Sequence, residues 1–147
     1  MPYSSSTIIL TNPFEVTWNL LLDALIHPSY YMATVESYEI KDRTEDEFIR
    51  HLKTKQLSTI EKVKINFRTK EVLLTLMDHP RYRGTVVFRV LEQKNKNAES
   101  EVALTMTLDW KDLKNLETPL DNKFSTKVEA TLENFKSALI DNNPRKK

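Results

Sequence analysis

The last long segment of the chain, residues 124–140, constrains the fold more than any other stretch. Its apolar residues recur in steps of three and four, at Phe124, Val128, Leu132, Phe135 and Leu139. This spacing places them along one side of an α-helix and leaves lysines and glutamates on the other side. A helix of this length is a rod of about 25 Å. Such a rod needs an apolar partner of similar length, and the rest of the sequence predicts a β-sheet.

Between residues 35 and 110 the pattern changes from helical spacing to alternation. Apolar and polar residues alternate in a way that predicts strands at 35–41, 47–53, 61–67, 72–76, 82–90 and 102–110. β-Branched residues predict a further strand at 4–11. Ile60 breaks the alternation of its strand, which predicts a bulge near Thr59. Gly84 is the single glycine and lies on a predicted inward face, where glycine marks a bulge, a bend or a close approach of another group. We interpret it as a bend, because a sheet that encloses a helix must curve.

The segment after the first strand predicts a capped helix. Asn12 can accept hydrogen bonds from the first helical amides, Pro13 has the φ angle wanted at the first position, and Glu15 completes a capping box. Pro28 moves His27 out of helical geometry and so ends this helix. A second short helix is predicted at residues 29–32.

Size and charge exclude several classes of protein. A chain of 147 residues is predicted to form one domain, 1–147, with a disordered tail at 142–147. The net charge is +1 and no long apolar run is present, so neither nucleic acid nor an integral membrane segment is predicted. A basic stripe of Lys62, Lys64 and Arg68 is interpreted as a solvated face. The absence of cysteine rules out thiolate chemistry, and a cytoplasmic protein is expected.

The three histidines do not predict a metal site. His27, His51 and His79 are far apart, and none has a second ligand at metal-binding spacing. No serine lies in a Gly-x-Ser-x-Gly elbow, so serine hydrolase chemistry has no support. We therefore expect no metal and no cofactor.

The order of predicted elements resembles the helix-grip fold of START-like domains, the SRPBCC superfamily that includes the birch pollen allergen, and it is most similar to the uncharacterised AtaL-like branch. The residues that carry this resemblance are 12–18, His27-Pro28, Phe48-Ile49-Arg50, Thr59-Ile60-Glu61, Tyr82-Arg83-Gly84-Thr85 and the closing helix from Phe124. The resemblance implies an α+β fold in which a curved seven-stranded antiparallel sheet encloses a long C-terminal helix. Two short helices would connect strands 1 and 2.

The resemblance also implies a function. It predicts an internal cavity for a small hydrophobic or amphipathic ligand, such as a lipid, a polyketide or an aromatic compound, in a monomer or weak dimer. Two alternatives remain: an enzyme of the polyketide cyclase or aromatase type, and a protein-binding module that uses the outer sheet face. A solid core without a cavity is the simplest contrary interpretation.

Candidate site residues follow from the predicted inward faces. The residues expected to line the ligand site are Tyr31, Phe48, Arg50, Val63, Ile65, Leu74, Leu76, Tyr82, Val86, Phe88, Met106, Leu108, Phe124, Val128 and Leu132. Arg50, Glu61 and Tyr82 are the candidate catalytic residues because each interrupts an apolar face. Arg50 and Glu61 could instead form a structural ion pair, and Tyr82 could lie at a rim with its hydroxyl in water.

Overall fold

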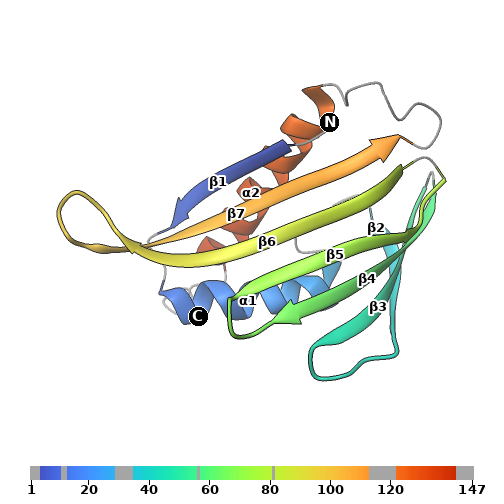
Figure 1. The fold of residues 1–147 in the computed structure, drawn as a ribbon, viewed down its shortest axis with the longest axis horizontal. Coiled ribbons are helices and arrows are strands. Elements are labelled where there is room, and N and C mark those ends of the chain that lie inside the picture. Colours follow the sequence, from blue (N-terminus) through green and yellow to red (C-terminus); the bar gives the residue numbers. More distant parts are fainter. Residues whose placement is uncertain are drawn as a thin grey trace.

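The computed structural model describes residues 4–10, 13–28, 35–55, 57–80, 82–112 and 122–141, with only the backbone at 4, 112, 122–127 and 138–141. Seven strands and two helices make up this part of the chain (Figure 1). In order they are β1 (Ser4–Leu10), α1 (Phe14–Ile26), β2 (Val35–Lys41), β3 (Glu47–Thr54), β4 (Ser58–Asn66), β5 (Glu71–Asp78), β6 (Tyr82–Lys94), β7 (Ser100–Asp112) and α2 (Asn122–Asp141).

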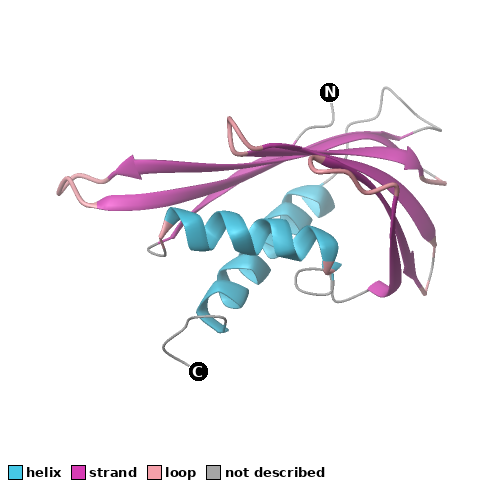
Figure 2. Ribbon diagram, turned by 90° about the horizontal axis from the view of Figure 1, so that it is seen from below, coloured by secondary structure: helices cyan, strands magenta, loops and turns pink. Residues whose placement is uncertain are grey.

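The strands form one antiparallel sheet in the order β1-β7-β6-β5-β4-β3-β2. The sheet is curved, and both helices lie under its concave face (Figure 2). Helix α2 packs on β1 and β7, whereas α1 packs on β6, β7 and α2. The predicted α+β class and the curved seven-stranded antiparallel sheet are therefore confirmed. Neither helix, as far as the chain is described, is long and apolar enough to cross a membrane.

The helices are held by their apolar faces. In α2 the buried residues Val128, Leu132 and Phe135 keep the predicted steps of four and three. The ring of Phe135 meets the ring of Phe88 on β6 edge to face, with 5.5 Å between centroids. Helix α1 contributes a second stripe, with Thr17, Trp18, Leu21, Ala24 and Leu25 buried. The core therefore lies between the concave face of the sheet, from β1 to β3, and both helices rather than around α2 alone.

The start of α1 differs from the prediction, whereas its end does not. The helix begins at Phe14, and Pro13 is the N-cap with ψ of 149° and no side-chain capping bond. Pro13 is therefore the N-cap rather than the first helical residue, and Glu15 is the second helical residue rather than the third, so the predicted capping box is wrong. Asn12 lies outside the described residues. The helix ends at Ile26, and His27 has left helical geometry with φ of −119°, as the following proline requires. The short helix predicted at 29–32 also lies outside the described residues.

A register shift occurs beside the predicted bulge, but the extra residue is on the other strand. Ile60 pairs with Asp78, and the next residue of β4, Glu61, pairs with Leu76. One step on β4 thus matches two steps on β5, so the extra residue is Met77. Alternation within β4 indicates that pairing changes there, but it cannot tell which of two partners carries the insertion.

Gly84 is required by a close approach of two strands, so the predicted bend is not the main reason for it. Its φ is +140°, a conformation that residues with a Cβ rarely adopt. A Cβ at this position would lie 2.1 Å from the carbonyl oxygen of Asp109 on β7. Next to it, the pairing of β5 with β6 ends at Thr75 and Thr85. The concave face therefore has a break between these two strands, beside a glycine.

Candidate functional site

A row of residues crosses the concave face of the sheet and forms the candidate site. Register pairs Ile40 of β2 with Arg50 of β3, Arg50 with Glu61 of β4, and Glu61 with Leu76 of β5. On the other side of the break, Gly84 of β6 pairs with Trp110 of β7. Directly opposite residues in antiparallel strands have Cβ atoms about 5 Å apart. The row therefore puts two charged side chains next to apolar neighbours on the concave face.

Arg50 and Glu61 form a buried ion pair. The Nε and Nη2 atoms of Arg50 both donate to Oε1 of Glu61, at 3.0 and 2.7 Å. The two side chains are 1% and 9% exposed, so water screens this pair little. Two donors on one oxygen fix the orientation of both side chains. The structure therefore brings these two predicted residues together, and the pair is not a solvent-exposed one.

Arg50 also joins the sheet to the first helix. Its Nη1 donates to the backbone carbonyl of Leu25 at 3.1 Å. Leu25 lies in the last turn of α1, where carbonyl groups lack helical partners and the helix dipole favours a positive charge. The guanidinium thus satisfies a carbonyl at the end of α1 while it neutralises Glu61. This contact gives Arg50 a structural role that the sequence pattern does not predict.

Glu61 retains a free acceptor. Its second carboxylate oxygen, Oε2, makes no hydrogen bond with any residue in the described part of the chain, whereas Oε1 receives both bonds from Arg50. The neighbouring Leu76 is only partly buried, and so is Ile65, four residues further along β4. A ligand on this face would therefore meet one hydrogen-bond acceptor within apolar surroundings.

Three aromatic rings lie close together where β5 and β7 end and β6 begins. Tyr82 stacks on Trp110 with 5.6 Å between centroids and an angle of 27° between planes. The ring of His79 lies 5.1 Å from Tyr82 and 5.8 Å from Trp110. The backbone N–H of Tyr82 donates to Nδ1 of His79 at 3.0 Å, which makes Nδ1 the acceptor nitrogen of that imidazole. The stacking on Trp110 therefore holds the ring of Tyr82 in place, which goes beyond the predicted position at a rim.

The predicted lining residues divide into a packed group and an accessible group. Those at most 5% exposed belong to the core: Phe48, Val63, Leu74, Val86, Phe88, Met106, Leu108, Val128 and Leu132. Ile65, Leu76 and Tyr82 are partly buried and pack against that core. Tyr31 and the side chain of Phe124 lie outside the described residues. Ile65, Leu76 and Tyr82 are therefore the predicted lining residues that keep some exposed surface, and we take them as the apolar part of the candidate site.

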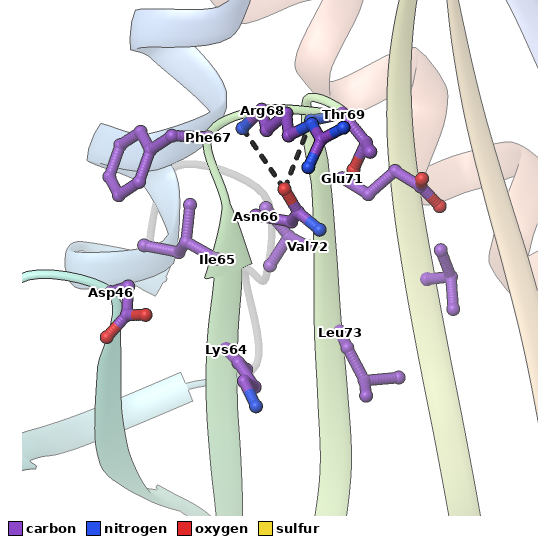
Figure 3. A pocket seen from close by; sticks show the side chains of 11 residues that line it. Asp46, Lys64, Ile65, Asn66, Phe67, Arg68, Thr69, Glu71, Val72 and Leu73 are labelled. Atoms are coloured by element: carbon purple, nitrogen blue, oxygen red, sulfur yellow. Dashed lines mark hydrogen bonds between the residues drawn. The ribbon is translucent and has the colours of Figure 1, made fainter.

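A surface cleft that the sequence did not predict lies at the β4–β5 hairpin (Figure 3). It has a volume of about 590 Å³ and combines apolar side chains such as Leu73 and Val87 with charged ones. Asn66 shapes the turn, because its Oδ1 accepts the backbone N–H groups of Arg68 and Thr69, each at 3.1 Å. The asparagine that opens the turn is visible in the sequence, but the convergence of two strand faces and a turn is not.

Glu71 at this cleft provides a test by pH. The Nη2 of Arg89 donates to its carboxylate at 2.9 Å, and this hydrogen bond lowers the pKa of Glu71. A carboxyl whose folded-state pKa is lowered stabilises the fold above its unfolded pKa, and this stabilisation is lost as the pH falls through the folded value. Because the pair is exposed, we expect Glu71→Gln to cost about 0.5 kcal/mol or less at neutral pH. Urea unfolding of both proteins should show that difference vanish in acid, and a difference that grows in acid would contradict the assignment.

Metal chemistry has no assembled ligands in the described part of the chain. No group of three or more histidine, aspartate or glutamate residues there could hold a metal ion.

The outer-face Lys62 is paired with Glu47 at 3.0 Å. Part of the basic stripe is therefore neutralised by the sheet itself.

Comparisons with known proteins identify the fold. No protein-family model and no curated protein matches this chain. Among solved structures, the protein TTHA0849 from Thermus thermophilus is 15% identical, and the match covers 97% of this chain and 99% of that one with a TM-score of 0.66. An uncharacterised protein from Bacillus thuringiensis is 13% identical, with 94% and 98% covered and a TM-score of 0.68.

One similar structure is an enzyme. The Zhui aromatase/cyclase from Streptomyces is 14% identical, and the match covers 92% of this chain and 87% of that one with a TM-score of 0.58. Identities this low establish a shared architecture and leave activity open. The chain therefore has a helix-grip-like α+β fold, which it shares with an aromatase/cyclase and with an uncharacterised protein.

Proposed function

We propose that this protein binds a small hydrophobic or amphipathic molecule, a lipid, a polyketide or another aromatic compound, on the concave face beside Glu61. The carrying observation is the free Oε2 of a buried glutamate among partly buried apolar residues. Ligand sites in proteins are mostly apolar, with a few fixed polar groups that orient the ligand. Here the two hydrogen bonds from Arg50 hold the carboxylate of Glu61 in one orientation, and Leu76 and Ile65 supply the apolar surface.

The ligand would carry a hydrogen-bond donor at one end. An ionised carboxylate accepts hydrogen bonds but cannot donate them. Oε2 therefore selects a hydroxyl or an N–H group of the ligand over a carbonyl. The aromatic rings of Tyr82 and Trp110, across the break between β5 and β6, favour a planar partner. We place the protein in the AtaL-like branch on the residues that carry the resemblance, in particular Phe48-Ile49-Arg50 and Tyr82-Arg83-Gly84-Thr85.

Native mass spectrometry of the purified protein tests binding directly. We expect an additional mass that is released on denaturation, and its value would give the class of ligand. A bare chain, together with an unchanged melting temperature in the presence of fatty acids and aromatic polyketides, would contradict the proposal.

A matched pair of variants locates the site on one face of β5. Leu76 lies opposite Glu61 on the concave face, whereas Leu73 on the same strand is 38% exposed on the other face. We expect Leu76→Gln to weaken ligand binding about tenfold, the effect of losing one to two kcal/mol of apolar contact. Leu73→Gln should bind as the wild type does. Equal binding by both variants, with folding checked by circular dichroism, would move the site elsewhere.

An enzymatic role is the second candidate, and the likeness to the Zhui aromatase/cyclase supports it. In that case Oε2 of Glu61 would accept a proton from the substrate, a step that contributes a factor of about 10² to 10⁴. Glu61→Gln keeps the side-chain volume and an acceptor for Arg50 but cannot take up the proton. We expect loss of turnover of a polyketide-like substrate with binding retained. Loss of both together would favour a carrier over an enzyme.

A further inference from the structure

In the described part of the chain, no strand pairs with the outer edge of β1. β1 lies at one end of the strand order and pairs with β7 through seven consecutive residues, from Ser4 opposite Leu108 to Leu10 opposite Val102, without a bulge. Its sequence, SSSTIIL, contains no charged residue and no proline. Strand edges expose a row of backbone N–H and C=O groups, and natural proteins usually block them with charges, prolines or bulges. β1 uses none of these devices.

The opposite edge of the same sheet shows the usual protection. β2 has the sequence VESYEIK, with three charged residues in seven. A register irregularity between Val35 and Ser37 interrupts its pairing with β3. Glu39 and Lys41 of β2 form an ion pair at 3.6 Å, and both side chains are exposed. One edge of the sheet thus carries the usual protection against strand addition, whereas the other, as far as the chain is described, carries none.

Contacts on both faces hold β1 in place. On the convex side, hydroxyl groups bridge β1 to β7, between Ser5 and Thr107 at 3.0 Å and between Thr7 and Thr105 at 2.8 Å. On the concave side, α2 packs against β1. Pairing another strand would therefore cost little ordering of this one, since the backbone is already held in the extended conformation.

We propose that β1 pairs antiparallel with β1 of a second copy of this chain, which would join the two sheets into one. Thr7 is the central residue of the strand, so a two-fold axis beside it pairs all seven residues and places Thr7 opposite Thr7 of the second copy. A strand that is uncharged along its whole length meets no repulsion when it pairs with itself. A two-fold contact of this kind uses the same patch on both subunits and closes without forming a filament.

The exposed apolar residues next to this edge support a second copy as the occupant. Ile9 of β1 is 45% exposed, and it lies in one cross-strand row with Ala103 of β7 and Leu91 of β6. Strand pairing at β1 would cover Ile9 of both copies, whereas Leu91, two strands inside the sheet, would stay in water. The contact is small, so the dimer is expected to be weak and to dissociate on dilution.

A concentration series by sedimentation velocity tests the association, with Ile9→Lys and Leu91→Lys as a matched pair. Both residues are exposed and apolar, at 45% and 53%, and both point to the convex face. We expect the wild type and Leu91→Lys to form a dimer at about 100 µM and Ile9→Lys to need at least about tenfold more protein. A wild type that stays monomeric at this concentration would overturn the proposal. Equal loss by both variants would assign the contact to the sheet face and overturn it also.

Cysteine cross-linking tests the register, because the chain has no cysteine of its own. With strands about 4.8 Å apart, the two copies of Thr7 would be neighbours, whereas the two copies of Thr105 would be about 14 Å apart. We expect Thr7→Cys to form a covalent dimer on oxidation and Thr105→Cys to remain monomeric. The two substitutions remove the same hydrogen bond, so any loss of stability is shared. Cross-linking of both variants, or of neither, would overturn the pairing at β1.

Discussion

Arg50→Met is expected to destabilise the fold by about 3 to 5 kcal/mol, because it leaves the carboxylate of Glu61 buried and without a counter-charge. Arg50 is 1% exposed and makes two bonds to Oε1 of Glu61. The substitution also removes a partner of the Leu25 carbonyl at the end of α1. Urea unfolding followed by circular dichroism measures the loss as a lower midpoint at an unchanged slope.

A double variant separates the two contacts of Arg50. Arg50→Met/Glu61→Leu removes both charges, so the penalty for an unpaired buried charge disappears. We expect a remaining loss of about 1 to 3 kcal/mol, which reflects the carbonyl of Leu25 left without this donor. Adding Glu61→Leu to Arg50→Met should therefore raise stability. A double variant less stable than Arg50→Met would show that the pair does not act through its charge.

An exposed ion pair in the same sheet provides the control. Arg89 of β6 and Glu71 of β5 form a cross-strand pair with a 2.9 Å contact, close to the 2.7 Å contact of the buried pair. The side chain of Arg89 is 58% exposed, so Arg89→Met should cost about 0.5 kcal/mol or less. Similar losses for Arg50→Met and Arg89→Met would mean that burial contributes nothing.

Alternation alone predicted much of the sheet. In β3 and β4 the period of two placed Phe48, Arg50, Glu61 and Val63 on one face, and the structure buries all four. The pairing of Arg50 with Glu61 followed from the same pattern, because both interrupt an apolar face on adjacent strands. Periodicity is a local property, so it can be read from consecutive residues without knowledge of the partner strand.

Contacts between distant segments could not be predicted in this way. Nothing in residues 14–26 shows that the carbonyl of Leu25 faces Arg50, since this depends on where α1 crosses the sheet. The extra residue of the β4–β5 irregularity was assigned to the wrong strand because either strand could carry it. The open edge of β1 was equally hidden, since an uncharged strand becomes an edge only through the order in which strands pair.

The role of Gly84 could not be predicted from its strand alone either. A lone glycine in a strand is compatible with a bend or with a close approach, and the sequence does not distinguish the two. The structure shows a φ of +140° and no room for a Cβ, which would lie 2.1 Å from a backbone oxygen and 2.8 Å from Cα of Trp110. Both atoms belong to the backbone of β7, so neither can rotate away as a side chain would.

Gly84→Ala is therefore expected to destabilise the fold by about 2 to 4 kcal/mol, from backbone strain and from the overlap with β7. Arg83→Ala, at an exposed position on the same strand, should change stability by less than about 0.5 kcal/mol. The damage should be local as well, because β7 can relieve the overlap only by moving the backbone that carries Trp110. In a Trp18→Phe background Trp110 is the single tryptophan, and its emission should shift in Gly84→Ala but not in Arg83→Ala. Wild-type stability of Gly84→Ala, with unchanged emission, would contradict the close approach of β6 and β7.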